Sequence, residues 1–319
     1  MTKITPLWMT WSYHLAFWLI TLSKCRASLR PNKRIFTSGY PMKPQHIGVV
    51  ITTYNQPKWL RKVLFGYEAQ RDHHFTVIVA DDGSGQPTRE VIEFFQARGI
   101  LRLQHIWHED KGFQKCQILN KAIAQTECDY LIFTDGDCIP EPDFVEIHRN
   151  LARPRQFLSG GYIKLTTPVS EAISEADIAS GVIFDTRWLK QAGQPASHKL
   201  WKLIKNKLIK AVLNAVTPTK ATWNGMNSST WTADIKACNG FNEDMQYGGL
   251  DRELGERLQN YGLKGKQVRY SVNCLHLDHP RAYDNPETWK KNYAIRNEVK
   301  RTGRYWATNG IVKQSITTP

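Results

Sequence analysis

The 319-residue chain has few cysteines, and none of them has the spacing of a metal cluster or a disulfide framework. The six cysteines include no C-x-x-C pair, so we expect unpaired thiols in a reducing compartment. Acidic residues are also scarce, since 29 Asp and Glu stand against 43 Lys and Arg, for a formal net charge of +14. This excess predicts an anionic partner: nucleic acid, an acidic glycan or an anionic lipid surface.

Long apolar runs are missing as well. The most apolar segment, Leu7 to Leu22, is interrupted by polar residues and is shorter than the ~20 residues of a membrane-spanning helix. No small-residue cleavage site of a signal peptide follows it. Its tryptophans and the cations after it suit a helix lying at a membrane interface, and a helix packed on the domain is the alternative. We therefore expect residues 1–45 to form a membrane-proximal segment.

Short β-branched runs alternate with helical segments in the first half of the chain. The predicted strands are 47–53, 76–80, 101–107 and 130–135, and the predicted helices are 58–68, 87–97 and 115–124. Strands and helices that alternate at this spacing indicate βαβ units and a mostly parallel sheet. The sequence therefore predicts an α/β fold, with a Rossmann-like sheet flanked by helices over residues 46–150.

The alternation stops after Asn150. We expect a strand over 157–165 and mostly helical chain over 171–216, within a more helical second half that spans residues 151–285. An apolar strand is expected over 268–275, and a helical tail over 286–319.

A basic amphipathic helix is expected over 199–216. Apolar residues recur at helical spacing on one stripe, and lysines occupy the rest of the surface. This pattern favours contact with an anionic membrane. The alternative is a surface helix docked on the sheet, with its lysines merely solvated.

Polar clusters follow three of the predicted strands. These clusters are Thr52-Thr53-Tyr54, Asp81-Asp82 and Asp135-Gly136-Asp137. Ligands of open α/β sheets collect beyond the carboxyl ends of the strands, so the three clusters are expected to face one crevice. Hydroxyls, a stacking ring and a carboxylate suit a nucleoside, and two carboxylates one residue apart suit a divalent cation on its phosphates. Each Asp-rich cluster taken alone is also compatible with an ordinary turn.

With these motifs the chain resembles the inverting glycosyltransferases of family 2, which have the GT-A fold. The matching segments are Val50–Asn55, Val79–Ser84, Asp110–Lys115 with Asn120-Lys121, and Phe133–Asp137, and the resemblance resumes over 223–262. The resemblance implies that Thr52 and Tyr54 contact the base of a nucleotide-sugar and that Asp82 accepts its N3–H.

The same resemblance implies roles for the residues near the phosphates. Asp135 would approach the ribose or the metal, and Asp137 would hold Mn²⁺ or Mg²⁺ on the diphosphate. Lys115 lies where such enzymes carry a cation near the donor phosphates, and a solvated lysine at a helix start is the alternative.

The second half resembles the acceptor part of family members with a galactosyltransferase-like C-terminal region. Their pattern is roughly W-G-x-E-D, and here Tyr247 replaces Trp and Leu250 replaces Glu. This departure leaves Asp251 as the implied catalytic base, since inversion needs one carboxylate within reach of the acceptor hydroxyl. The residues expected on the acceptor and donor-sugar side are Gly160, Asn224, Asn227 and Tyr247.

Two histidines follow in Leu275-His-Leu-Asp-His-Pro280. The resemblance implies a metal-binding histidine at this distance after the acceptor motif. We favour His276 over His279 because it ends an apolar strand. Ordinary loop polarity is the alternative for both.

We therefore expect a metal-dependent, inverting glycosyltransferase that uses a nucleotide-sugar, most simply a UDP-sugar. Its acceptor would be a hydroxyl of a surface glycan or lipid-linked saccharide, of lipopolysaccharide or capsule type. The enzyme would lie in the cytoplasm, peripherally on the inner face of an anionic cell membrane.

Two other functions fit the sequence less well. A sugar-phosphate nucleotidyltransferase would need a Gly-rich, basic phosphate loop after the first strand, and Thr53–Gln56 offers none. A nucleic-acid-binding protein would gather its cations on a groove or recognition element, whereas these cations concentrate on apolar-faced helices. We expect no nucleic-acid partner.

Overall fold

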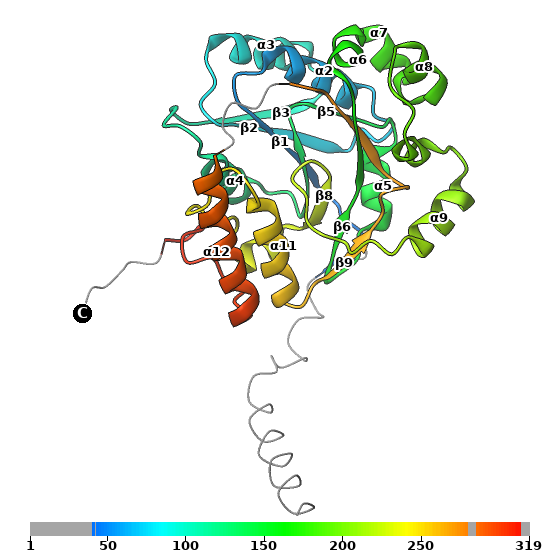
Figure 1. Ribbon diagram of the computed structural model, residues 1–319. Helices are drawn as coiled ribbons and strands as arrows, with labels where there is room; N and C mark the ends of the chain where they lie inside the picture. The colour runs from blue at the N-terminus through cyan, green and yellow to red at the C-terminus, as the bar shows by residue number, and fades with distance from the viewer. Residues whose placement is uncertain (1–39, 42, 280–284, 314–319) are drawn as a thin grey trace, which may run out of the picture. The chain divides into compact units, whose positions relative to one another are not determined.

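The structure is a computed structural model that describes residues 40–41, 43–279 and 285–313 (Figure 1). The predicted membrane-proximal helix at 7–22 lies outside these residues. Among the described residues no helix has the length and hydropathy needed to cross a membrane.

Seven strands form the main sheet, in the order β3-β2-β1-β4-β8-β6-β9. They are β1 (Ile47–Thr53), β2 (Phe75–Asp81), β3 (Arg102–Trp107), β4 (Tyr130–Asp135), β6 (Gln156–Ser159), β8 (Ser228–Trp231) and β9 (Lys264–Gln267). The first four strands are parallel to one another, and β8 is antiparallel to both of its neighbours. The predicted mostly parallel sheet is confirmed.

The register of the sheet brings the predicted polar clusters to one edge. Thr53 at the end of β1 pairs with Asp81 at the end of β2, and Thr52 pairs with Asp135 at the end of β4. Because these strands are parallel, all three clusters follow the sheet at the same side. The fold therefore places them together, as the sequence predicts.

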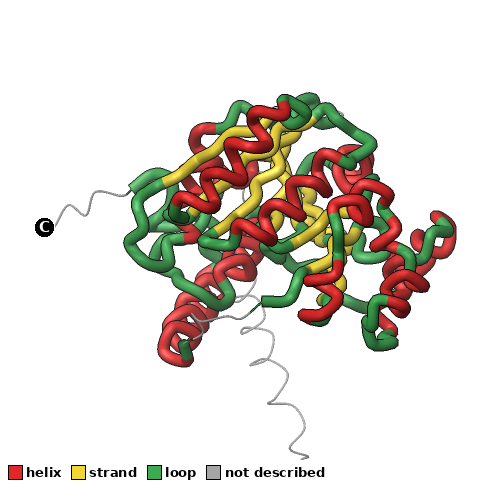
Figure 2. Tube along the Cα trace, turned by 90° about the horizontal axis from the view of Figure 1, so that it is seen from above, coloured by secondary structure: helices red, strands yellow, loops and turns green. Residues whose placement is uncertain are grey.

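Helices flank the strands, which Figure 2 shows lying between them. The longer helices are α2 (Pro57–Glu68), α3 (Gln86–Arg98), α4 (Lys115–Gln125), α5 (Phe144–Leu151), α11 (Leu250–Asn260) and α12 (Pro286–Thr302), and α10 (Thr232–Ala237) is shorter. Helix α4 packs against β1, β2 and β3, while α11 lies beside α12. A hydrophobic core cluster fills the space between the sheet and α4, α10 and α11.

The predicted strand over 157–165 is two strands in different sheets. The first, β6, ends at Ser159, and β7 (Gly161–Lys164) joins a second sheet in the order β5-β10-β7, with β5 (Cys138–Pro140) and β10 (Asn273–His276). The chain changes sheet at Ser159-Gly160-Gly161, where two glycines interrupt the apolar pattern. The predicted strand over 268–275 is likewise reduced to the four residues of β10.

The predicted helical stretch 171–216 is a series of short helices. These are α6 (Thr167–Ala172), α7 (Glu175–Ser180), η1 (Val182–Phe184), α8 (Thr186–Gln191), η2 (His198–Leu203) and α9 (Lys207–Val216). The expected continuous helix over 199–216 is therefore wrong. The side chain of Asn206 accepts hydrogen bonds from the backbone N–H groups of Leu208 and Ile209, which starts a new helix after η2.

The expected helical tail over 286–319 is also shorter than predicted. Helix α12 ends at Thr302, where Gly303 has a φ of 69°. Glycine adopts this left-handed conformation without the steric cost that other residues meet, which makes it a common helix terminator.

Candidate active site

The carboxylate of Asp135 links the end of β4 to β1 and α4. The hydroxyl of Thr52 donates to Asp135 Oδ1 at 2.7 Å, and Lys115 Nζ donates to the same oxygen at 2.6 Å. Burial lowers the pKa of Lys115, but the carboxylates of Asp135 and Asp251 more than compensate and hold it above its ordinary value. The site therefore contains a permanent cation between two carboxylates.

Asp82 is held in a fixed orientation at the end of β2. Its Oδ1 lies 2.8 Å from His108 Nε2, and its Oδ2 accepts the backbone N–H of Gln114 at 3.0 Å. Burial raises the pKa of this carboxyl group, and His108 partly offsets that effect. Two directional contacts on one carboxylate leave its plane little freedom to turn.

The neighbouring Asp81 has a structural role. It is fully buried, contacts His105 Nε2 at 2.9 Å and accepts the backbone N–H of Ser84 at 2.8 Å. Of the two adjacent carboxylates, only Asp82 keeps any exposed surface. This agrees with the choice of Asp82 as the ligand-binding residue.

Tyr54 keeps 44% of its surface exposed, although its hydroxyl donates to Asp110 Oδ2 at 2.8 Å. The loop that carries Asp110 comes close to β2 because Gly83 has no side chain. A Cβ at Gly83, whose φ is 93°, would lie 2.6 Å from Asp110 Cα. Glycine is required there for both reasons, and the contact holds the tyrosine ring in place with an open face.

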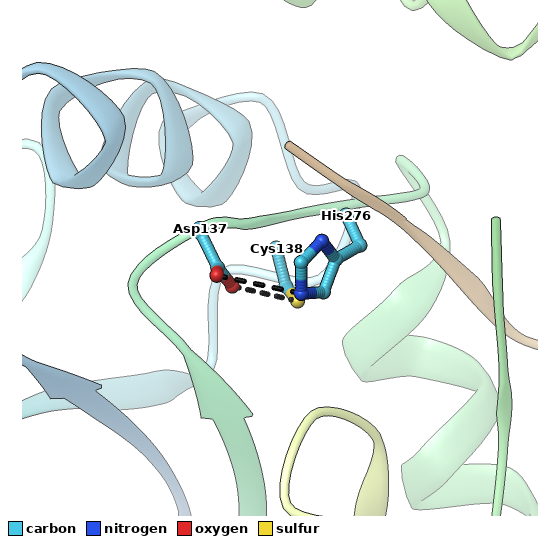
Figure 3. Close-up of side chains that lie close together, drawn as sticks. All are labelled: Asp137, Cys138 and His276. Atoms are coloured by element: carbon cyan, nitrogen blue, oxygen red, sulfur yellow. Dashed lines mark hydrogen bonds and ion pairs between the residues drawn. The ribbon is translucent and has the colours of Figure 1, made fainter. Parts of the chain in front are cut away.

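A second cluster lies where the two sheets meet. Asp137, Cys138 and His276 bring potential metal-binding atoms within 4.8 Å of one another (Figure 3). His279 Nε2 lies 2.7 Å from Asp137 Oδ2, and His276 Nε2 lies 3.4 Å from the same oxygen. The two imidazole rings are stacked, with 6.1 Å between their centroids.

This cluster has the donor atoms that a divalent transition metal needs. Burial raises the pKa of Asp137, but His279 and His276 outweigh it and bring the pKa below its ordinary value, so the group is an anion. One carboxylate with one or two imidazoles suits Mn²⁺ better than Mg²⁺, which prefers oxygen alone. Both predicted histidines contact Asp137: His276 belongs to the three-residue cluster, and His279 makes the shorter contact.

Asp251 lies in the first turn of α11, whose N-cap is Gly249. Its Oδ1 is buried and has no hydrogen-bond partner. A Cβ on Gly225 would lie 2.7 Å from this oxygen, so the carboxylate packs directly against the glycine backbone. Burial and the nearby Asp135 raise the pKa of Asp251 to about 6, while Lys115 acts in the opposite direction.

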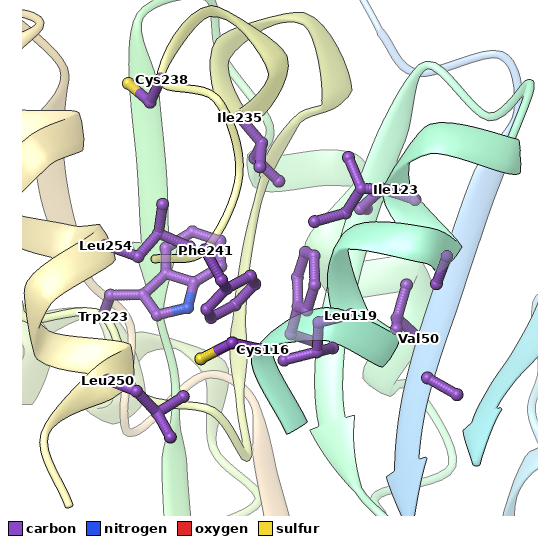
Figure 4. Packing of buried hydrophobic residues seen from close by; sticks show 14 of the residues in the cluster. Val50, Cys116, Leu119, Ile123, Trp223, Ile235, Cys238, Phe241, Leu250 and Leu254 are labelled. Atoms are coloured by element: carbon purple, nitrogen blue, oxygen red, sulfur yellow. The ribbon is translucent and has the colours of Figure 1, made fainter. Parts of the chain in front are cut away.

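The core holds the helix that carries Asp251. Leu250 and Leu254 of α11 pack beside Trp223, with Phe241 and residues of α4 around them (Figure 4). The ring of Trp223 lies edge-on to Phe133 of β4, 5.5 Å between centroids. A Cβ at Gly255 would lie 2.6 Å from Trp223 Cβ, which shows how closely α11 approaches this ring. The position of Asp251 relative to β4 is thus set by packing.

Comparison with known proteins identifies the family. The family model described as Glycosyl transferase family 2 matches residues 48–154, which contain the strand ends described above. The uncharacterized glycosyltransferase YfnE of Bacillus subtilis (strain 168) is 36% identical over 317 residues, covering 84% of this chain and 75% of the relative. The chain belongs to glycosyltransferase family 2. It is therefore a glycosyltransferase, and not a nucleotidyltransferase or a non-enzymatic polyanion-binding protein.

Solved structures show the GT-A fold of this glycosyltransferase. S. aureus TarS 1–349 in complex with UDP-GlcNAc superposes with a TM-score of 0.54 at 16% identity, covering 78% of this chain and 64% of that one. The mannosyltransferase PcManGT from Pyrobaculum calidifontis, in complex with GDP-Man and Mn²⁺, has a TM-score of 0.51 at 16% identity, covering 91% and 81%. The chain spans about half or less of the length of several other curated relatives that it matches.

Two residues expected on the sugar side of the glycosyltransferase site are in the core instead. Asn227 is fully buried, where it donates to Gly161 O at 2.7 Å and contacts His148 Nε2 at 3.0 Å. A Cβ at Gly160 would lie 2.1 Å from Asn227 Oδ1. The expectation that Gly160 and Asn227 contact a sugar is therefore wrong. They join β6, β7 and β8.

The other two residues expected on the sugar side, Asn224 and Tyr247, both contact neighbouring residues of the protein. Asn224 Oδ1 accepts the backbone N–H of Asn227 at 2.8 Å, so its side chain closes a turn. The ring of Tyr247 packs edge-on to Phe113 and Trp289, with centroids 6.1 and 6.2 Å away. A role for Tyr247 on the acceptor side stays a prediction.

Sequence reasoning missed His108 and Cys138. His108 directly follows β3, so the rule that ligands gather at carboxyl ends of parallel strands could have found it. Cys138 follows Asp137, but its place opposite His276 depends on the pairing of β5 with β10, which no local pattern indicates.

Proposed function

We propose that this glycosyltransferase transfers a sugar from a UDP-sugar to a hydroxyl of a surface glycan or lipid-linked saccharide, with inversion, and depends on Mn²⁺ or Mg²⁺. The observation that carries the proposal is the carboxylate of Asp251, whose buried Oδ1 has no hydrogen-bond partner and which interacts electrostatically with Lys115 and Asp135. It is the base that single displacement requires, next to groups suited to a nucleotide.

The strand ends would bind the nucleoside. Tyr54 offers an exposed ring for stacking on the base, and the oriented carboxylate of Asp82 would accept the N3–H of uracil. Asp135, held by Thr52 and Lys115, would accept from a ribose hydroxyl. The complex of TarS with UDP-GlcNAc supports a uridine donor in this fold.

Asp137 with His276 or His279 would hold the divalent ion, and Cys138 lies within reach of it. When bound, the ion would neutralise negative charge on the leaving diphosphate. Lys115 would supply a second, fixed positive charge near the donor phosphates. The mannosyltransferase complex with GDP-Man and Mn²⁺ supports a manganese ion in this fold.

Asp251 would take the proton of the acceptor hydroxyl as the oxygen attacks the sugar. With a pKa of about 6 it is ionised at neutral pH yet basic enough to act. Glu253 cannot share this role, because it is buried and both of its oxygens bind Arg257 at 2.8 and 2.9 Å. Because Asp251 lies in the galactosyltransferase-like second half, we assign acceptor binding to that half.

The acceptor would be presented at a membrane. The net charge of +14 suits an enzyme attached peripherally to the cytoplasmic face of an anionic bilayer, where lipid-linked saccharides are exposed.

The function is tested with a panel of UDP- and GDP-sugars and lipid-linked acceptors, by measuring release of nucleoside diphosphate with Mn²⁺, Mg²⁺ or chelator. We expect release with a UDP-sugar, loss with chelator, and recovery with Mn²⁺. Asp137→Ala should remove the response to the ion, whereas Glu109→Gln, at a side chain that is 75% exposed, should not. Full turnover in chelator, or no turnover with any UDP-sugar, would disprove the proposal.

A further inference from the structure

Helix α9 presents its apolar side chains to solvent. Leu208, Ile209, Val212 and Val216 are 74%, 45%, 51% and 66% exposed, and none of the ten residues of the helix is buried. At 100° per residue these four side chains fall on one face. Trp201, on the preceding helix η2, is 62% exposed. Figure 1 shows α9 at the margin of the described structure, away from the main sheet.

The opposite face of α9 makes polar contacts with the rest of the protein. Asn214 Nδ2 donates to Ser271 Oγ at 2.7 Å, and Asn214 Oδ1 accepts the backbone N–H of Tyr270 at 3.0 Å. Lys210 Nζ lies 4.0 Å from Glu141 Oε1 and only 14% of its side chain is exposed. A surface helix ordinarily has the reverse arrangement, with the apolar face inward. The four apolar side chains of α9 named above therefore do not serve to pack it on the domain.

The chain around α9 has an excess of positive charge, although Arg187 and Lys205 both contact Asp185. No Asp or Glu occurs between Thr186 and Ala233, and the segment contains Arg187, Lys190, Lys199, Lys202, Lys205, Lys207, Lys210 and Lys220. Lys199, Lys205 and Lys207 are exposed. An apolar face with a cationic rim matches a bilayer that contains anionic lipids, where the apolar side chains enter the acyl boundary and the lysines meet the headgroups.

We propose that the outward face of α9, together with Trp201, docks on the surface of an anionic membrane. A second copy of the chain is a poorer occupant, because it would bring an identical cationic rim against this one. A nucleic acid or acidic glycan would use the lysines but leave the apolar face exposed. Tryptophan is a residue that prefers the membrane interface.

The docking face is connected to the candidate metal cluster. Lys202 of η2 donates from Nζ to the backbone oxygen of Tyr162 on β7 at 2.8 Å, and the ring of Tyr162 lies 6.3 Å from the ring of His276. An enzyme docked through α9 would hold this side of the site near the lipid surface. The inference rests on the proposed function for the lipid-linked acceptor, whereas membrane binding itself does not require catalysis.

The test is sedimentation of the full chain with vesicles of phosphatidylcholine, with or without phosphatidylglycerol. Binding is expected only with the anionic lipid and should weaken as salt is added. Leu208→Ser/Val212→Ser should weaken binding roughly tenfold, from the loss of two partly inserted side chains. The matched control Ile100→Ser/Val312→Ser removes two side chains that are 51% and 57% exposed elsewhere, and should bind like the parent.

The charge contribution is tested in the same way. Lys199→Gln/Lys207→Gln should weaken binding roughly tenfold or more, at about 1 kcal/mol for each lysine near an anionic surface. Lys290→Gln/Lys291→Gln makes the same charge change at exposed lysines of α12 and should have a much smaller effect.

Amide hydrogen exchange locates the contact independently of any other membrane-binding segment. Exchange over residues 207–217 should slow when anionic vesicles are added, while exchange over α12 should not change. Unaltered exchange at 207–217 in the vesicle-bound state would refute the proposal. Slower exchange at 207–217 that depends on protein concentration in the absence of lipid would also refute it, because that result means self-association. Asp251→Asn should bind vesicles like the parent, so failure of the catalytic proposal is distinguished from failure of this one.

Discussion

The carboxylates at the strand ends and the carboxylate on α11 are held in opposite ways. Asp82, Asp135 and Asp137 each contact a histidine or a lysine within 2.8 Å. Asp251 Oδ1 is buried and has no hydrogen-bond partner. Hydrogen bonds from fixed partners orient a carboxylate, which suits ligand binding. An oxygen without a partner is open to accept a proton, and burial raises the pKa of Asp251 to about 6, which suits proton transfer.

The largest expected effect comes from removing the unpartnered carboxylate. Asp251→Asn keeps the shape of the side chain but cannot accept a proton, so kcat should fall by about 10³-fold. Binding of UDP, measured by calorimetry, should stay unchanged because the strand ends are intact. A variant with the turnover of the parent would remove Asp251 from the mechanism.

A smaller loss is expected when the same carboxylate is only displaced. Gly225→Ala places a Cβ 2.7 Å from Asp251 Oδ1, so the carboxylate must move. We expect kcat to fall by up to about a hundredfold, with UDP affinity unchanged. Gly85→Ala is the control, since its nearest neighbour would be 3.8 Å from the new Cβ. Equal activity of the two variants would contradict the packing described for Asp251.

The pH dependence of turnover tests the role of Asp251 as the base. The pKa of Asp251 is raised to about 6, so its catalytic form is lost as the pH falls through that value. The profile of kcat/KM should decline about tenfold per pH unit below about 6. Because Lys115 lowers the pKa of Asp251, Lys115→Gln should move this midpoint upward. A midpoint that moves downward, or not at all, would mean that the lysine does not act on the base.

The smallest effect is expected at a partner of a strand-end carboxylate. His108→Ala leaves Asp82 with one of its two contacts, and the KM for the nucleotide-sugar should rise roughly tenfold, with little change in kcat. His105→Ala removes the equivalent contact of the buried Asp81 and should lower the Tm instead of raising KM. If both variants behaved alike, the division between a ligand-binding and a structural aspartate would fail.

The first half of the chain was predicted well because its patterns are local. The strands 47–53 and 130–135 are β1 and β4 as predicted, and the other early elements differ by one residue at one end or at both. Polar residues that end parallel strands are brought together by the topology alone, so Thr52, Asp82 and Asp135 could be grouped from the sequence.

The second half was predicted less well because its contacts depend on residues far apart in the chain. The side chain of Asn227 was expected at the sugar, but its partners Gly161 and His148 lie 66 and 79 residues away. The break between η2 and α9 depends on one capping asparagine inside a continuous apolar and basic pattern. The pattern of 199–216 indicated an amphipathic helix but not which face would point outward.

By itself the sequence determined the α/β sheet, the family and the strand-end residues, because periodicity and turn chemistry act over a few neighbouring positions. Tertiary structure alone decided that Oδ1 of Asp251 has no hydrogen-bond partner, that Cys138 joins His276, and that α9 turns its apolar face to solvent. These properties depend on burial and on which groups remain unpaired after packing. That outcome is set by the whole fold, and no local pattern contains it.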